Sequence, residues 1–417
     1  MSEKVVKKEN KAFKSINTYV LLFSLIVIAT ILTYVVPAGE FNRVEDPNTG
    51  RMLADPESFH YIEKNPATFF DMFKAIPDGL VDSAKIIFFI FVISGVVQII
   101  NATGAINAGL LRLTQRFRGR EKFLLPIFMF FFSFTGAFLG FSEENIVFTP
   151  LAVSVAKYLG YDGVVGMCIS YLATQIGFCA GMMNPFSVGV AQGIAGLPMF
   201  SGIGFRFFIY AVLMIVSGIY VIRYAERVRK NPETSLVYGI KVDESKFVDL
   251  SSVDVKLTAG HKVIYLLFLA ALVVILYGGY NLGWYVNEIS AVFIILGILA
   301  GIIGGLKPKK IADEFINGAK GITFGALIVG FAKAVYLIMD NAKILDTMIN
   351  GIVRTLDIFP ASITVIGLFI VQWFINFIIT SSTGLAAIAM PILIPIADML
   401  KINRQVTVVA FQLGDNI

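Results

Sequence analysis

The chain has 417 residues, of which 57% are hydrophobic and 15% are charged, and its formal net charge is +5. With a mean hydropathy of +0.78, it has too few polar residues to cover a soluble protein, so we expect an all-α polytopic membrane protein. The Lys and Arg residues lie in short loops, where they set topology, which argues against nucleic acid as a partner. We expect no metal site and no cofactor, because the Cys and His residues are few and scattered: Cys168, Cys179, His60 and His261.

The first apolar runs alternate with charged segments. The N-terminal segment is basic, with Lys4, Lys7, Lys8, Lys11 and Lys14. By the positive-inside rule it is cytoplasmic, and the run at 18–36 is a full membrane span rather than a cleavable signal peptide. The acidic segment 38–83 then lies outside, and a second span at 84–102 returns to the cytoplasm. An amphipathic stretch at 104–115 follows it there.

The next apolar stretch is interrupted by polar residues. Runs at 123–139 and 146–159 flank a polar tip at 140–145, and each run is short for a membrane span, which needs about 20 residues. We therefore expect a re-entrant hairpin over about 123–160 that enters and leaves the membrane on the cytoplasmic side.

A discontinuous helix is expected over about 163–195. Its apolar pattern is interrupted at Gly177, Gly181 and the Asn184-Pro185 pair. Unwound backbone at membrane depth is tolerated only where protein or a water-filled cavity covers it, so this break indicates a functional region.

The rest of the chain repeats these themes after a span at 203–222 and a soluble-looking linker at 231–260. Lys333 lies near the middle of one later span, where it either reaches toward the membrane surface or pairs with an acid. The later predicted elements are spans at 261–280, 286–306 and 322–339, an amphipathic stretch at 341–358, a second hairpin at about 362–400 with its tip at 380–384, and a second broken helix from about 404.

The two halves resemble each other at a nearly constant offset. At an offset of 242 residues, Asp71, Phe73, Gly79, Gly109 and Arg112 recur as Asp313, Phe315, Gly321, Gly351 and Arg354. At an offset of 241 residues, Pro150, Ala156 and Leu159 recur as Pro391, Ala397 and Leu400. The span at 84–102 runs inward and its counterpart at 322–339 runs outward, so the repeat is inverted. Inverted repeats with broken helices near the membrane midplane are typical of secondary transporters.

The repeat divides the chain into three parts. Residues 1–230 form the first repeat, 231–260 a cytoplasmic linker, and 261–417 a connecting span and the second repeat. Residue 176 corresponds to residue 417, so the sequence stops where the second helix should break. We therefore expect a C-terminally truncated chain.

The first hairpin tip carries Ser142, Glu143, Glu144 and Asn145. An acid at the bilayer centre costs about 2.5–3.5 kcal/mol, so two adjacent acids need an explanation. In one, Ser142 caps the second arm and the acids favour the helix dipole. In the other, at least one carboxylate faces a cavity and binds a cation, which is the substrate, a proton or Na⁺.

The second tip is neutral and rich in hydroxyl groups, with Ser381, Ser382, Thr383 and Gly384. A helix cap with a glycine turn explains it. So does an anion site, because a helix N-terminus lined with hydroxyl groups suits a carboxylate.

Two broken helices complete the predicted substrate site. Asn184 and Ser187 lie at the first break, where freed carbonyl groups suit Na⁺, and Asp415 and Asn416 lie in the second broken helix. The candidate residues for a coupling ion, Na⁺ or H⁺, are Glu143, Glu144, Asn184 and Asp415.

Several stretches carry a resemblance to a known family: Val36–Phe41, Thr103–Ile106, Gly140–Glu144, Asn184–Phe186, and Met390-Pro391 through Phe411–Asp415. Across nearly its whole length the chain resembles the C4-dicarboxylate anaerobic carrier family of the ion-transporter superfamily, and within it the YfcC-like branch of basic amino-acid (arginine/ornithine) antiporters. The resemblance implies a homodimer in which a transport domain moves against a scaffold in an elevator-type cycle.

One tip is acidic and the other is neutral, which suits a ligand with a cationic end and a carboxylate end. We therefore expect a transporter that exchanges a basic amino acid, of the arginine or ornithine type, across the bacterial plasma membrane. The alternative is a Na⁺- or H⁺-coupled carrier of C4-dicarboxylates or other carboxylates, in which the acids serve only the coupling ion. We expect no enzyme, because Gln412 interrupts the Gly-x-Gly-Asp motif of intramembrane aspartyl proteases and Ser381–Gly384 lacks the Gly-x-Ser-Gly motif of rhomboid-type proteases. The paired hairpins argue against a channel.

Overall fold

The computed structural model describes residues 18–45, 52–55, 57–116, 121–142, 145, 148–240, 257–356, 358–376 and 382–416. Within these residues, eight helical segments are long and apolar enough to cross a membrane. The prediction of a polytopic helical membrane protein is therefore confirmed. Glu143, Glu144 and Ser381 lie outside the described residues, as do the N-terminal lysines and most of the linker.

The first half contains ten α-helices and four short strands among its described residues. The elements up to the first hairpin are α1 (Thr18–Val35), β1 (Gly39–Glu40), β2 (Arg43–Glu45), β3 (Met52–Ala54), β4 (His60–Tyr61), α2 (Phe69–Asp82), α3 (Ala84–Ala102) and α4 (Ala105–Arg116). The later ones are α5 (Glu121–Phe134), the π-helical turn η1 (Thr135–Leu139), α6 (Thr149–Tyr158), α7 (Gly163–Met167), η3 (Cys168–Leu172), α8 (Ala173–Ala180), η4 (Pro185–Gly189), α9 (Val190–Ala195) and α10 (Ile203–Lys230). β1 pairs with β4 and β2 with β3, both antiparallel.

The second half begins after the short 3₁₀ turn η5 (Pro232–Thr234). Its helices are α11 (Ala259–Asn281), α12 (Val286–Ile303), α13 (Pro308–Asn341), α14 (Leu345–Leu356), α15 (Ala361–Asn376), α16 (Ser382–Met399) and α17 (Arg404–Asn416). Two predicted hairpins thus correspond to the pairs α5–α6 and α15–α16. Their re-entrant path through a membrane stays a prediction, and α16 is long enough by itself to cross one.

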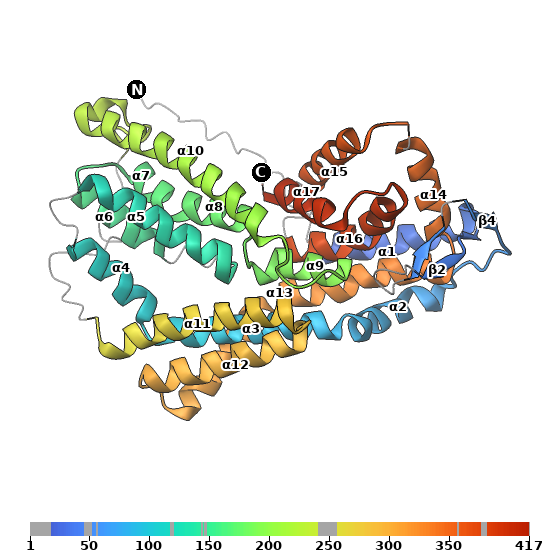
Figure 1. The fold of residues 1–417 in the computed structure, drawn as a ribbon, viewed down its shortest axis with the longest axis horizontal. Coiled ribbons are helices and arrows are strands. Elements are labelled where there is room, and N and C mark those ends of the chain that lie inside the picture. Colours follow the sequence, from blue (N-terminus) through green and yellow to red (C-terminus); the bar gives the residue numbers. More distant parts are fainter. Residues whose placement is uncertain are drawn as a thin grey trace, which may run out of the picture.

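The long helices lie side by side along the long axis of the molecule (Figure 1). α13 packs antiparallel against α2 and α3, because Gly318 contacts Ser94 while Gly330 contacts Leu80. A Cβ added to Gly318 would lie 2.3 Å from the Ser94 carbonyl oxygen, so glycine permits this close approach. Small residues at helix interfaces are how membrane proteins bring helix backbones together.

Repeat-equivalent turns have the same geometry in both halves. Gly160 and Lys401, 241 residues apart, both have a positive φ, of 82° and 54°. Two residues later in each half, a side chain caps the next helix: Asp162 accepts a bond from the Val165 backbone N–H at 2.9 Å, and Asn403 accepts one from the Gln405 backbone N–H at 2.8 Å. The 241-residue offset thus appears in the geometry as well as in the sequence.

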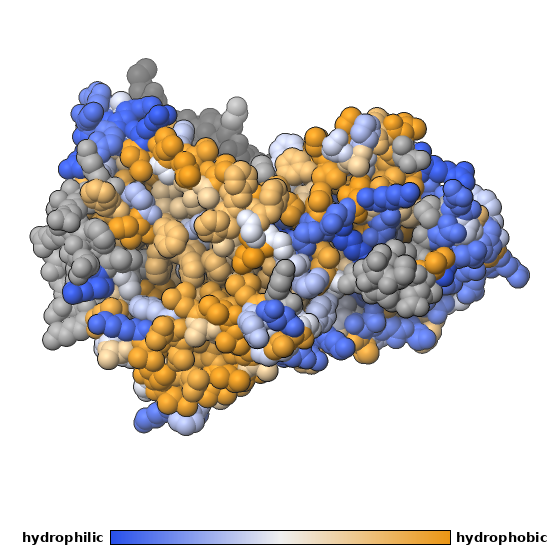
Figure 2. Space-filling model, viewed as in Figure 1, coloured by the Kyte–Doolittle hydropathy of each residue, from blue (hydrophilic) through white to orange (hydrophobic). Residues whose placement is uncertain are grey.

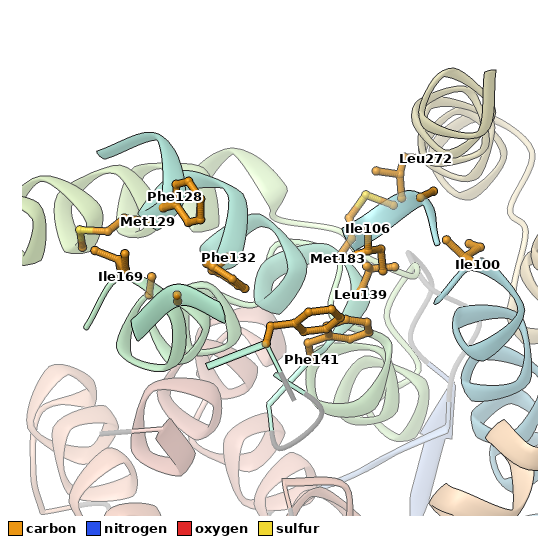
Figure 3. Packing of buried hydrophobic residues seen from close by; sticks show 14 of the residues in the cluster. Ile100, Ile106, Phe128, Met129, Phe132, Leu139, Phe141, Ile169, Met183 and Leu272 are labelled. Carbon is orange, nitrogen blue, oxygen red and sulfur yellow. The ribbon is translucent and has the colours of Figure 1, made fainter. Parts of the chain in front are cut away.

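Buried apolar side chains form the largest core between α3, α5, α8, α11 and α12. Phe132, Leu139, Phe141 and Met183 belong to it, which anchors the end of the first hairpin arm in the protein interior (Figure 3). Large hydrophobic residues are also exposed on α10, α11, α12 and α15, and they give the molecule the broad hydrophobic surface seen in Figure 2. A lipid environment accommodates such a surface.

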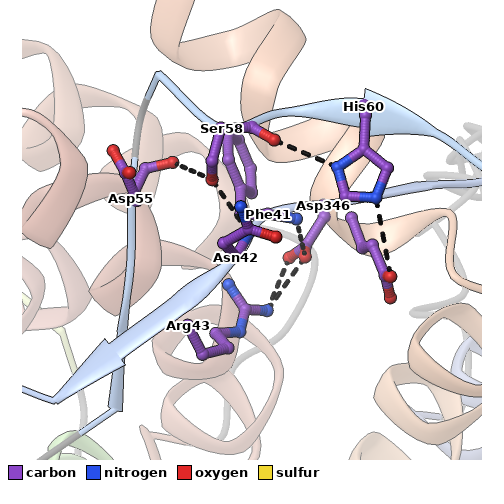
Figure 4. A network of polar contacts seen from close by, with 8 residues as sticks. Phe41, Asn42, Arg43, Asp55, Ser58, His60 and Asp346 are labelled. Carbon is purple, nitrogen blue, oxygen red and sulfur yellow. Dashed lines mark hydrogen bonds and ion pairs between the residues drawn. The ribbon is translucent and has the colours of Figure 1, made fainter.

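The segment predicted to lie outside, 38–83, is more structured than the sequence indicated, because it contains four strands and α2. Arg43 donates to both carboxylate oxygens of Asp346 at 2.9 Å, and the Phe41 backbone N–H donates to Asp346 at 3.1 Å (Figure 4). This network joins the loop after α1 to the start of α14. At the start of α2, the Thr68 hydroxyl and backbone N–H hold the pKa of Asp71 below its ordinary value.

Two sequence predictions need correction. Gly177 was expected to break a helix, but it lies inside α8, where it permits contact with Ser133; only the break at 181–184 exists. The predicted span at 322–339 is part of α13, which begins at Pro308. Charged residues at its start lowered the local hydropathy without interrupting the helix.

Candidate functional site

The helix is interrupted after α8, and the backbone of residues 181–184 leaves the helical path inside the protein. Gly181 ends α8 with a φ of 52°, and Asn184 starts the next helical segment. The Asn184 side-chain oxygen accepts bonds from the backbone N–H groups of Phe186 at 2.9 Å and Ser187 at 3.3 Å. Asn184 and Ser187 are 0% exposed. Asn184 Nδ2 and Ser187 Oγ have no hydrogen-bond partner within the part of the chain that the structure describes, so both are available for a ligand.

The first hairpin tip lies against this break. A Cβ added to Gly140, whose φ is 68°, would lie 2.6 Å from the Asn184 side-chain oxygen, so only glycine fits there. Beyond the turn, Asn145 is buried and its Nδ2 donates to the Thr174 hydroxyl. Ser142 accepts a bond from Gln175 at 3.0 Å. The described part of the tip is therefore held by the broken helix.

The second hairpin reaches the same break from the other half of the chain. The Thr383 hydroxyl donates to the Phe186 carbonyl oxygen at 2.8 Å. Gln412 of α17 donates to the Phe178 carbonyl oxygen, also at 2.8 Å. A Cβ added to Gly181 would lie 2.9 Å from the Gln412 amide nitrogen, so this side chain lies directly over the break.

The buried carboxylate of Asp415, in the last turn of α17, lies against the start of α16. Ser382 donates to Asp415 Oδ2, and Asn376 donates to the Asp415 backbone carbonyl at 2.5 Å. Asp415 is 241 residues after Thr174, which Asn145 contacts in the first half. In both halves, therefore, a polar residue of the hairpin tip bonds to the repeat-equivalent position, on α8 in the first half and on α17 in the second.

The structure brings most of the described predicted residues together. Asn184, Ser187 and Thr383 surround the Phe186 turn, with Gly384 buried beside them in α16. Ser142 and Asn145 lie on one side, and Ser382 and Asp415 on the other. Glu143, Glu144 and Ser381 are outside the described residues, and Asn416 is the last residue of α17.

A polar cluster near the start of α10 was not predicted. Gln192, Gln405 and Arg206 all donate to the Ser201 carbonyl oxygen, at 2.8, 2.9 and 2.5 Å. Arg206 is 1% exposed, which is costly for a cation. The only signal in the sequence was a single arginine within the apolar run 203–222, and the spacing of the glutamines in the chain did not reveal their convergence.

Lys333 forms an ion pair with Asp82 at 2.9 Å and lies 4.2 Å from the centre of the Tyr336 ring. Of the roles considered for it, pairing with an acid is the one observed. This pair joins α13 to the end of α2 rather than to the candidate site.

The site offers hydroxyl, amide and carbonyl groups with one buried carboxylate. Such groups hold a small polar molecule or a monovalent cation through several weak contacts. Within the described residues, no group of three or more His, Cys, Asp or Glu side chains could hold a metal ion.

Comparisons with known proteins agree with this architecture. An Escherichia coli K12 protein named "Putative basic amino acid antiporter YfcC" is 32% identical over 100% of this chain and 89% of its own length. A Haemophilus influenzae protein is 27% identical over 98% of this chain and 88% of its own.

Two solved transporter structures share the fold. The YdaH transporter of Alcanivorax borkumensis has a TM-score of 0.64 at 16% identity, covering 96% of this chain and 87% of its own. Neisseria gonorrhoeae MtrF, described among antimetabolite efflux pumps, has a TM-score of 0.69 at 18% identity. The match covers 97% of this chain and 85% of the MtrF chain.

The family comparison covers almost the whole sequence. Residues 16–417 match the family described as DcuC, C4-dicarboxylate anaerobic carrier. Together with the full-length similarity to the Escherichia coli protein, this match identifies a membrane transporter. The chain belongs to the C4-dicarboxylate anaerobic carrier family.

Proposed function

We propose that this chain is a secondary active transporter that exchanges a basic amino acid across the bacterial plasma membrane. The observation that carries the proposal is the convergence of both hairpins on one buried turn, where Thr383 contacts Phe186 beside the polar groups of Asn184 and Ser187. Elements from opposite halves that meet at a helix break form a site that both sides of a membrane can reach in turn.

The chemistry of the two sides favours a zwitterionic substrate with an additional positive charge. The sequence has Glu143 and Glu144 in the first tip, and Asp415 is a buried carboxylate on the opposite side. The N-terminus of α16 suits a substrate carboxylate, although the Ser382 and Thr383 hydroxyl groups already donate to Asp415 and to the Phe186 carbonyl oxygen. The full-length relative named as a basic amino acid antiporter supports the same substrate class.

The transport cycle that fits this proposal is of the elevator type. α5–α6 and α15–α16 act as re-entrant hairpins in a transport domain, and the long helices α2, α3 and α13 belong to a scaffold that forms a homodimer. The N-terminus is cytoplasmic. The candidate positions for a coupling ion, if Na⁺ or H⁺ takes part in the cycle, are Glu143, Glu144, Asn184 and Asp415.

A second candidate function is Na⁺- or H⁺-coupled transport of C4-dicarboxylates or other carboxylates. The family description names C4-dicarboxylates, and the neutral hydroxyl groups of the second tip suit a carboxylate as well as they suit an amino acid. In this case the acids would serve the coupling ion alone.

Reconstituted transport separates the two candidates. The full chain is placed in liposomes loaded with ornithine or arginine, and uptake of labelled arginine and of labelled succinate is measured separately. We expect arginine uptake that depends on internal ornithine or arginine. Succinate uptake without arginine exchange would overturn the amino-acid proposal in favour of the second candidate.

A matched pair of variants tests the site. Asp415→Asn should reduce arginine exchange at least tenfold, because a cationic substrate loses its buried counter-charge. Glu57→Gln removes an exposed carboxylate in the loop before β4 and should leave exchange unchanged. Equal exchange rates in the two variants would remove Asp415 from the substrate site.

A further inference from the structure

An apolar pocket of about 490 Å³ lies between α14, α15 and α16. Its walls include Ile352 and Leu356 of α14, Gly367 of α15 and Ile388 of α16. The polar side chains in its lining are Thr364 and Gln372, which are 4% and 1% exposed and so offer little polar surface. The pocket has the volume of a small-molecule site but lacks the polar groups that would orient a soluble ligand.

A second pocket of about 410 Å³ lies in the first half, between α3, α5 and α11. Four residues of α5 line this second pocket. At the 241-residue offset, each corresponds to a residue of α15 that lines the pocket between α14, α15 and α16. The pairs are Ile127 with Leu368, Phe130 with Val371, Phe131 with Gln372, and Phe134 with Ile375. Corresponding residues on the first arm of each hairpin thus line both pockets, whereas the opposite walls differ: α14 and α16 in one pocket, and α3 and α11 in the other.

Both pockets have exposed apolar side chains at their edges. Val371 and Ile363 are 50% and 52% exposed at the first pocket, and Phe130 is 57% exposed at the second. The surface over α15 is correspondingly hydrophobic (Figure 2). In a bilayer, an apolar cavity of this size does not hold water, because water finds no polar partners there. If the cavity were empty, the side chains of its walls would lack dispersion contacts on that side. A hydrocarbon chain from the surrounding lipid restores those contacts.

The charge beside each pocket indicates the kind of lipid. α14 and α4 are 12-residue amphipathic helices, of the kind that lie at a membrane surface. α14 carries the exposed residue Arg354 in its last turn, two positions before the pocket residue Leu356. The repeat-equivalent residue on α4 is Arg112, which is also exposed. Arginines at this level attract anionic phospholipid headgroups.

We propose that the pocket between α14, α15 and α16 is a binding site for an anionic phospholipid, with one acyl chain in the pocket and the headgroup near Arg354, and that the pocket lined by Phe130 is its counterpart in the first half. In Figure 1, α4 and α14 lie toward opposite ends of the molecule. The proposal does not depend on which substrate is carried.

A glycine in the wall permits a direct test. No heavy atom of the described residues lies within 4 Å of a Cβ added to Gly367, so Gly367→Leu places a side chain in the pocket wall without a clash at its Cβ. Gly218 of α10 is equally open and lies outside both pockets, so Gly218→Leu is the matched control. The full chain is purified with phosphatidylglycerol, and native mass spectrometry counts the retained lipids. We expect Gly367→Leu to retain one lipid fewer per chain than the unmodified protein and Gly218→Leu to retain the same number.

A second measurement remains informative if Gly367→Leu folds poorly. A single tryptophan is placed in the wall by Ile388→Trp in a chain with Trp284→Phe and Trp373→Phe, and acyl-brominated lipids quench its fluorescence. Brominated phosphatidylglycerol should quench more than brominated phosphatidylcholine, and Arg354→Gln should abolish the difference. Unchanged lipid retention in Gly367→Leu, or equal quenching by both lipids, overturns the proposal. A changed oligomeric state with unchanged lipid retention also overturns it and assigns the pocket to an interface between copies of the chain.

Discussion

The contact between α5 and α8 depends on a single glycine, and its replacement gives a sharp prediction. A Cβ added to Gly177 would lie 1.8 Å from the Ser133 carbonyl oxygen and 2.9 Å from the Ala137 backbone nitrogen. Ordinary contact begins near 3.4 Å, so the Gly177→Ala substitution must separate the two helices by about 1.6 Å. Both obstacles are backbone atoms, which cannot rotate away as a side chain can.

The expected cost is at the upper end of the range for an added methyl group in a packed interior, about 3 kcal/mol. Because α8 leads directly into the break at Gly181, the displacement also shifts the candidate site relative to the first hairpin. We therefore expect Gly177→Ala to lower both the melting temperature in detergent and the transport rate. The melting temperature is measured by the loss of monodisperse protein in size-exclusion chromatography after heating.

The control is Gly218→Ala, since no heavy atom of the described residues lies within 4 Å of a Cβ at that position. Both substitutions replace a glycine by alanine inside a helix, so they share the same gain in helix propensity, about 1 kcal/mol. Only the steric term differs. Equal melting temperatures for the two variants would refute the close contact between α5 and α8.

Two further predictions concern contacts that hold the site. Asn184→Ala removes the acceptor for the Phe186 and Ser187 backbone N–H groups and should cost about 0.5–2 kcal/mol, whereas Asn184→Ser keeps a neutral capping acceptor; melting temperatures of both variants check this, and an equal loss would contradict the capping role. Asp398 accepts two bonds from Arg404, at 2.7 and 2.6 Å, and both side chains are mostly buried. Asp398→Asn should therefore destabilise by about 3 kcal/mol, and the loss should be smaller in an Arg404→Met background; a double-mutant cycle without coupling would contradict the ion pair.

The apolar runs alone located most membrane helices. The spans expected at 18–36, 84–102 and 286–306 lie within a few residues of α1, α3 and α12. Long apolar runs have few alternatives in a membrane, because every backbone group must bond within its own helix. The Asn184-Pro185 pair also marked a break correctly, since proline has no N–H to donate, although proline alone is no sufficient signal, because Pro77, Pro126 and Pro391 lie inside helices.

Predictions from the local sequence pattern were wrong or missing where contacts with neighbouring elements decide the role of a residue. Gly177 was expected to break a helix, yet its lack of a side chain serves the contact with Ser133. Arg206 attracted no prediction, because its burial follows from the fold of the loop that ends at Ser201. In each case the residue type is compatible with several roles, and only the neighbouring backbone selects one.

The sequence by itself determined the membrane class, the family, the repeat and the polar residues of both tips. These properties depend on composition, hydrophobic run length and residue identity, which are all local. Only the tertiary structure decided that Thr383 meets the Phe186 turn across the two halves of the chain. That contact joins residues 197 positions apart, and no local preference specifies it. The packing of α8, α16 and α17 around one break specifies this contact. It brings two separate polar tips together in one candidate site.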